Sequence, residues 1–202
     1  MSIDPFELPQ ADVPLERADA ARNRQRILDA ADRLFTRDGV ACTSMDAIAL
    51  EAGVGKGTLF RRFGDRPSLA HALLDSSERE FQERLIRGPA PLGPGGPAAE
   101  RLIAFGPALL EHIGAHAEIV LAAETGKVPG RRLAAGPYGA YRAHLMMLIR
   151  EANPELDAEY TAEALLAPLG ADIVTYQLKT RGMTLERLAE GWEAIAQRLV
   201  LT

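Results

Sequence analysis

The sequence has 202 residues, of which 47% are hydrophobic, 25% charged and 5% aromatic, and its formal net charge is −5. A single cysteine, Cys42, excludes an intrachain disulfide, and no apolar run reaches the roughly 18 residues of a membrane-spanning helix. Residues 1–14 have neither the basic nor the apolar segment of a signal peptide, so we expect a cytoplasmic protein without a membrane partner.

Charge is distributed unevenly along the chain. Residues 15–70 carry ten Lys and Arg against eight Asp and Glu, whereas residues 71–202 carry thirteen against seventeen. The small positive excess therefore lies in one N-terminal segment, as a phosphate-facing surface would require.

Apolar periodicity and capping signals predict an all-α protein. Three prolines among residues 1–14 indicate a disordered arm, and four Gly and four Pro over 88–97 indicate a loop, as does the segment KVPGRRLAAGP. The domain boundaries that we expect are 1–14 for the arm, 15–66 for a first helical domain and 67–202 for a second. Helices are predicted over about 16–38, 43–52, 56–63, 65–86, 98–114, 116–125, 137–152, 156–180 and 184–201.

Two short predicted helices with a glycine turn between them follow the first long helix. Thr43 and Asp46 have the spacing of a helix-capping pair, so Thr43 is the predicted N-cap of the first short helix. Gly53 and Gly55 are expected to supply the backbone freedom of the turn. Leu59 and Phe63 are four residues apart and should face inward. This order is that of a helix-turn-helix, whose second helix enters a major groove.

The predicted recognition helix has a polar outer face that suits nucleic acid. Lys and Arg contact phosphates or guanine edges, Thr can read a base, and Gly permits close approach. Arg22, Arg24 and Arg26 of the preceding helix fit either a solvated face or phosphate contacts. The outer face consists of Lys56, Gly57, Thr58, Arg61 and Arg62.

The run TSMDAIALEAGVGKGTLFRRFGDRPSL, preceded by RQRILDAADRLFTRDG, resembles the N-terminal domain of the TetR family of transcriptional regulators. The resemblance covers about residues 20–75. It implies a repressor that binds double-stranded operator DNA and is released by a small-molecule effector. Phe60 departs from the family pattern, which usually has Tyr there with its hydroxyl on a phosphate. The DNA-contacting residues implied are Thr43, Ser44, Gly55, Lys56, Gly57, Thr58, Phe60, Arg61 and Arg62.

The last two predicted helices carry apolar stripes suited to a homodimer, because one recognition helix contacts too few base pairs alone. The same stripes could instead pack on the core of their own subunit, and the family resemblance favours the dimer. Pro168 and Gly170 should bend the first of these helices. The predicted interface residues are Leu165, Leu169, Ile173, Tyr176, Leu188, Trp192, Ile195 and Leu199.

Polar groups scattered among apolar ones between Ala98 and Ala152 predict a mostly apolar effector pocket. The spacing of His112 and His116 could bind zinc, but no further ligand completes a site, so we expect neither a metal nor a cofactor. The pocket candidates are Phe105, His112, Tyr141 and His144.

Two other classes of protein remain as alternatives. A helical adaptor could carry a helix-turn-helix that does not bind DNA. An enzyme is disfavoured, because the sequence has no nucleophile elbow, no P-loop and no dinucleotide-binding glycine motif after a strand.

Overall fold

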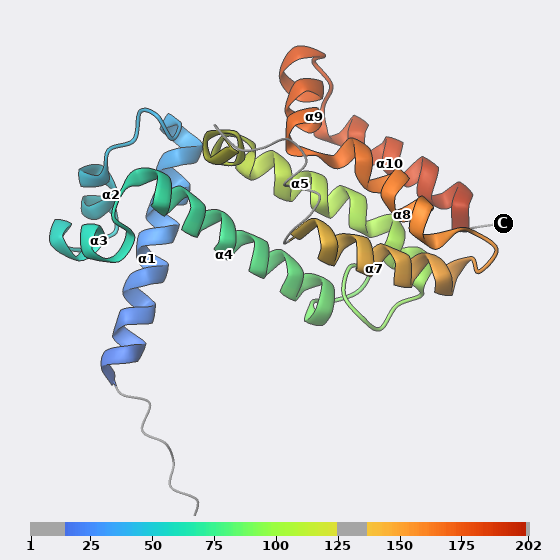
Figure 1. The fold of residues 1–202 in the computed structure, drawn as a ribbon, viewed down its shortest axis with the longest axis horizontal. Coiled ribbons are helices and arrows are strands. Elements are labelled where there is room, and N and C mark those ends of the chain that lie inside the picture. The colour runs from blue at the N-terminus through green and yellow to red at the C-terminus, as the bar shows by residue number, and fades with distance from the viewer. Residues whose placement is uncertain (1–14, 125–136, 201–202) are drawn as a thin grey trace, which may run out of the picture.

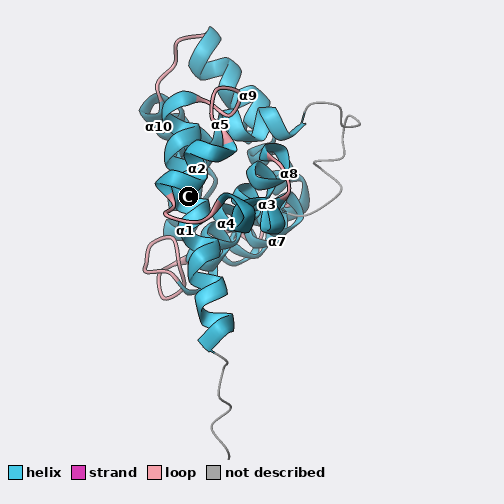
Figure 2. Ribbon diagram, turned by 90° about the vertical axis from the view of Figure 1, so that its left-hand side faces the viewer, coloured by secondary structure: helices cyan, strands magenta, loops and turns pink. Residues whose placement is uncertain are grey.

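The computed structural model describes residues 15–124 and 137–200, and every regular element in these two ranges is helical (Figure 2). The all-α fold class is therefore confirmed. The predicted N-terminal arm and nearly all of the segment KVPGRRLAAGP lie outside the described residues. No described helix is both long and apolar enough to cross a lipid bilayer. The helices are α1 (Leu15–Asp38), α2 (Met45–Glu51), α3 (Lys56–Phe63), α4 (Arg66–Arg87), α5 (Ala98–Glu124), α7 (Pro137–Ala152), α8 (Ala158–Leu166), α9 (Ala171–Thr175) and α10 (Leu185–Val200).

The N-terminal helices surround one small hydrophobic cluster, at the left of Figure 1. One face of α1 is buried there, together with the apolar sides of α2, α3 and the first half of α4. Ile119 near the end of α5 joins the same cluster, so α5 reaches into the N-terminal unit. The buried α1 residues are Ile27, Leu28, Ala30, Ala31, Leu34 and Phe35.

A second, larger cluster fills the bundle of α5, α7, α8 and α10. Phe81 and Leu85 belong to it, so α4 contributes its first half to the N-terminal cluster and its last turns to this one. The glycine- and proline-rich loop lies between α4 and α5, as predicted, and Leu92 of that loop is buried against the bundle.

The prediction of two helices over 98–125 was wrong, because α5 is one helix of 27 residues. Its Gly114 lies against Leu185 of α10, where a Cβ would be 3.2 Å from the leucine side chain. Burial along the bundle outweighs the intrinsic cost of glycine and of Pro107 inside a helix.

The helix predicted over 156–180 is interrupted rather than bent. After α8 a 3₁₀ turn runs over Ala167–Leu169, and Gly170 has extended backbone angles before α9 begins. A π-helical turn, Tyr176–Thr180, follows α9. Pro168 lacks the N–H that an α-helical hydrogen bond would need, and the interruption occurs there, where the sequence predicted a bend.

The predicted dimer stripes divide between the protein's own core and its surface. Leu165, Leu169 and Trp192 are buried in the bundle core, so their assignment to a dimer interface was wrong. The Trp192 Nε1–H donates to the Leu102 carbonyl at 3.1 Å, which fixes the indole inside the subunit. Leu188 and Leu199 are half-buried against that core, whereas the side chains that remain exposed are Ile173, Tyr176 and Ile195.

Candidate functional site

The glycine turn between α2 and α3 depends on one glycine. Gly53 has φ of +62°, a left-handed conformation that side chains disfavour. Arg26 of α1 donates from Nη2 to the Gly53 carbonyl at 3.2 Å, and a Cβ on Gly53 would lie 2.6 Å from the same nitrogen. Gly55, the N-cap of α3, has an ordinary φ of −67°, so the prediction that both glycines need unusual backbone freedom holds only for Gly53.

The start of α2 differs from the prediction by one residue. Ser44, rather than Thr43, is the N-cap, and its hydroxyl accepts a hydrogen bond from the Ala47 N–H at 3.1 Å. Thr43 is 3% exposed, and its hydroxyl lies 3.2 Å from the Leu34 carbonyl and 2.9 Å from that of Gly39, both acceptors. Thr43 therefore positions the end of α1 against α2 and does not offer its hydroxyl to a phosphate.

The outer face of α3 is exposed as predicted. Leu59 and Phe63 are buried on its inner side, whereas Thr58 is half-buried. Phe60 is 46% exposed, so an aromatic ring without a hydroxyl lies on the surface next to the basic groups. The exposed positions of the helix are Lys56, Gly57, Phe60, Arg61 and Arg62.

The three cations of α3 differ in their contacts. The Lys56 ammonium lies 2.5 Å from an Asp46 carboxylate oxygen of α2, and Arg62 donates to the Ala20 carbonyl of α1 at 2.6 Å. Arg61 has no hydrogen bond or ion pair with any described residue. Exposed ion pairs contribute little free energy, so Lys56 can exchange its carboxylate for another anion. Arg61 needs no such exchange.

Long-range arginine contacts around α3 were missed by the sequence analysis. Arg26 braces the turn, Arg66 donates to the carbonyls of Ala41 and Thr43, and Arg33 forms an ion pair with Glu51 at 3.1 Å. Each partner is 18 to 27 positions away, beyond the reach of helical spacing rules.

The predicted pocket residues form a packed cluster. Phe105 and Tyr141 are buried, with ring centres 5.8 Å apart, and the ring of His144 is 6.0 Å from that of Phe105. The Tyr141 hydroxyl donates to Glu78 at 2.5 Å, and burial beside that carboxylate raises the pKa of Tyr141. His112 stacks on Phe81, which also contacts Phe105 and Tyr141, and it lines a hollow between α1, α4 and α5.

Burial, followed by the nearby Arg101 charge, lowers the pKa of His144 to about 4. The Nε2 of His144 and the Nε of Arg101 are both buried without a hydrogen-bond partner. Within the described residues, no three His, Cys, Asp or Glu side chains come together as metal ligands would.

Comparison with known proteins gives the N-terminal helices a family. Residues 27–73 match the family described as bacterial regulatory proteins, tetR family. The N-terminal domain belongs to the TetR family. HTH-type transcriptional regulators from several Staphylococcus aureus strains are 47% identical over 58 residues. That match covers 29% of this chain and 31% of theirs, so the likeness spans less than a third of those relatives.

Solved structures extend the likeness of fold beyond this TetR-family domain. A transcriptional regulator from Saccharomonospora viridis in complex with choline superimposes with a TM-score of 0.70 at 21% identity, covering 88% of this chain and 96% of that one. A transcriptional regulator from Pseudomonas aeruginosa PAO1 gives 0.63 at 26% identity, covering 94% and 95%. The C-terminal bundle therefore has the same arrangement of helices as these regulators.

Proposed function

We propose that this protein is a transcriptional regulator that binds double-stranded operator DNA through α3. The observation that carries the proposal is the exposed outer face of α3, where Arg61 has no partner among the described residues, above a buried side that anchors the helix. The TetR-family domain supports it. Its DNA lies in the cytoplasm, so we assign the protein to that compartment, and no catalytic step is part of the proposal.

Each exposed group of α3 has a distinct role in this proposal. Arg61 reads a base edge or flanking phosphate, and Gly57 allows close approach. Lys56 exchanges Asp46 for a backbone phosphate, so its contribution is independent of sequence. Ser44 and Gly55 lie at the starts of α2 and α3, where exposed N–H groups favour a phosphate. Thr58 contacts DNA only by its exposed edge, Phe60 offers an apolar contact, and Arg62 holds α3 to α1.

We assign the dimer contact to the exposed apolar residues of the C-terminal bundle. Ile195 of α10 is 55% exposed, Ile173 of α9 is 37% exposed, and Tyr176, which follows α9 directly, is 52% exposed. Large apolar side chains that stay in water on a folded surface favour association. A two-fold dimer would present two copies of α3 to successive major grooves.

We further assign to this regulator the behaviour of a repressor released by a small-molecule effector. The complex of a protein of the same fold with choline supports a small-molecule ligand for a protein of this fold. A ligand acts as an effector only when its affinity differs between the DNA-competent and the released arrangement of the dimer.

Selection from random duplex DNA tests the DNA-binding proposal. The protein should enrich a short two-fold symmetric sequence, and its affinity should fall steeply with salt. Arg61→Ala should weaken binding by about 1–3 kcal/mol and relax preference at one position of each half-site. Arg79→Ala, an exposed arginine of α4, is the matched control and should leave binding unchanged. Enrichment of no sequence would favour the adaptor alternative.

Light scattering tests the dimer. Ile195→Glu places an unpaired charge in the proposed contact and should give folded monomers. Gln197→Glu adds the same charge on the other flank of the buried α10 stripe and should leave the dimer intact. A wild-type monomer at micromolar concentration, or a fully dimeric Ile195→Glu variant, would contradict the assignment.

A further inference from the structure

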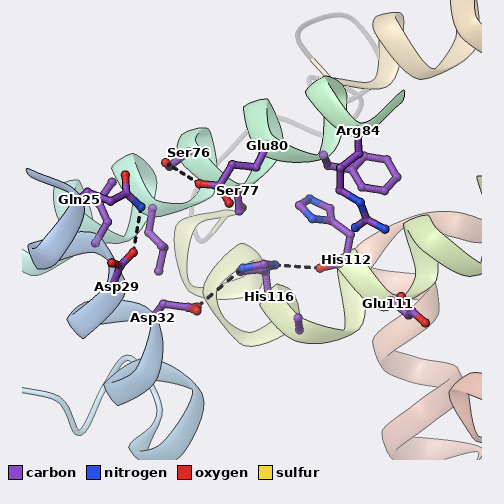
Figure 3. A pocket seen from close by; sticks show the side chains of 14 residues that line it. Gln25, Asp29, Asp32, Ser76, Ser77, Glu80, Arg84, Glu111, His112 and His116 are labelled. Atoms are coloured by element: carbon purple, nitrogen blue, oxygen red, sulfur yellow. Dashed lines mark hydrogen bonds and ion pairs between the residues drawn. The ribbon is translucent and has the colours of Figure 1, made fainter. Parts of the chain in front are cut away.

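A hollow of about 350 Å³ lies where the N-terminal helices meet the bundle. Its walls come from α1, α4 and α5 (Figure 3), and its volume is in the range of small-ligand sites. The hollow is distinct from the packed aromatic cluster of Phe105 and Tyr141, neither of which lines it. A ligand there would touch the first helix of the TetR-family domain and the central helix of the bundle together.

The charge of this hollow is predominantly negative. Among its lining residues, the one lysine or arginine is Arg84. Neutral donors hold two of the carboxylates: Gln25 donates to Asp29 at 2.9 Å, and Ser76 to Glu80 at 3.4 Å. Hydrogen bonds from neutral groups leave the negative charge uncompensated, so the hollow attracts a cation. The lining carboxylates are Asp29, Asp32, Glu80 and Glu111.

The remaining lining favours an organic cation over a bare metal ion. Leu28, Leu73 and Phe81 also line the hollow, and the ring of His112 is stacked on Phe81 with centres 4.9 Å apart. An apolar wall beside carboxylates suits a ligand with a carbon body and an ammonium head. Metal ions instead require several ligand atoms converging at short range.

One carboxylate of the hollow also connects the two halves of the protein. The Nδ1 of His116 lies 2.9 Å from the His112 carbonyl, so it donates there, and Nε2 lies 3.7 Å from an Asp32 carboxylate oxygen of α1, an ion pair in the protonated form of the ring. Figure 3 shows this contact between His116 of α5 and Asp32 of α1, both of which line the hollow. A cation that pairs with Asp32 would therefore compete with His116.

We infer that this hollow binds a small organic amine, with its ammonium among Asp29, Asp32 and Glu80 and its carbon body against Phe81 and Leu73. Binding draws Asp32 away from His116 and loosens α1 from α5, which lowers the affinity of α3 for DNA. The ligand site stands on the geometry alone, and its effect on DNA rests on the proposed function.

Calorimetric titration with benzylamine, benzyl alcohol and benzoate tests the site, because the three probes share a ring and differ in charge. Benzylamine should bind, whereas the alcohol and the carboxylate should not. Asp32→Asn and Glu80→Gln should each weaken the binding of benzylamine by about tenfold, because each removes one charge pair in a partly desolvated site. Asp75→Asn removes an exposed carboxylate of α4 outside the hollow and should change nothing.

A variant that binds benzylamine more tightly than wild type cannot be explained by damage to the fold. Arg84→Met removes the like charge from the hollow and should tighten benzylamine binding several-fold. No binding of benzylamine at millimolar concentration, equal binding of benzoate, or an unchanged affinity in Asp32→Asn would overturn the site.

Fluorescence anisotropy with the selected operator tests the effect on DNA separately. Saturating benzylamine should weaken DNA binding by about tenfold, within the usual range of coupling between two sites. An unchanged DNA affinity in a protein that binds benzylamine would overturn the competition with His116. A protein that binds benzylamine but no operator would instead contradict the proposed function and leave the ligand site standing.

Discussion

The two hydrophobic clusters of this protein are stabilised by different kinds of contact. The N-terminal cluster is built largely from residues 27–73, and its helices are tied by arginines that donate to backbone carbonyls, such as Arg26 to Gly53 and Arg62 to Ala20. In the bundle cluster, residues far apart in the chain contact each other. Trp192, for example, donates a hydrogen bond to the Leu102 carbonyl.

This difference decides which substitutions each part tolerates. In the N-terminal domain a demanding position is one with a left-handed backbone conformation, such as Gly53. In the bundle it is a close approach between distant side chains and backbone, at Gly106, where a Cβ would lie 2.1 Å from the Trp192 ring. A close approach cannot be relieved locally, so the larger destabilisation is expected in the bundle.

Gly106→Ala should therefore lower the free energy of unfolding most, by about 3 kcal/mol. The methyl group would overlap the indole, which its hydrogen bond to Leu102 holds in place, and overpacking of a filled core costs energy of this size. Urea unfolding at constant m-value would measure the change.

Gly139→Ala in α7 is the matched control for this substitution. Nothing lies within 4 Å of its added Cβ, so the same chemical change should leave stability equal or raise it by up to about 1 kcal/mol. Similar losses for both variants would mean that glycine flexibility, rather than contact with Trp192, explains the effect.

Gly53→Ala should lower the free energy of unfolding by about 1–2 kcal/mol. An alanine at φ of +62° is strained, whereas the clash with Arg26 involves the end of a flexible side chain and can relax. Gly57→Ala in α3 meets no atom within 4 Å and should not destabilise the fold. A Gly53→Ala protein as stable as the Gly57→Ala protein would show that the turn tolerates a side chain.

The N-terminal domain could be predicted from sequence because its signals are local. The bounds of α3 and its inward-facing Leu59 and Phe63 depend on residues a few positions apart. One error there, Thr43 in place of Ser44 as the α2 cap, arose because both residues have a hydroxyl and only tertiary contacts with Leu34 and Gly39 distinguish them.

The bundle was predicted less well because its decisive contacts are distant. An amphipathic stripe says which residues avoid water but not whether the partner is the same chain, so Trp192 was misplaced at a dimer contact. The hollow was missed for the same reason, since its lining comes from three helices and His116 meets Asp32 across 84 positions of sequence.

The smallest expected effect lies in the bundle and depends on pH. Because the pKa of His144 is lowered to about 4 in the folded protein, the residue stays neutral there between pH 4 and its ordinary value of about 6.5. The unfolded chain binds a proton in that window and the folded chain does not, so stability falls as the pH is lowered through it. Partial exposure of the ring screens the charge, which reduces the expected loss to about 1 kcal/mol.

Replacing His144 with glutamine isolates the contribution of His144 to the pH dependence of stability. The carboxylates titrate in both proteins, so their contribution cancels in the difference. The free energy of unfolding of wild type minus that of His144→Gln should decrease from pH 7 to pH 4, with the steepest change near pH 5 to 6. The Nε2 of His144 is buried without a partner, so protonation would place a charge beside Arg101 with no acceptor to stabilise it. Parallel pH profiles for the two proteins would mean that His144 takes up its proton in the folded bundle.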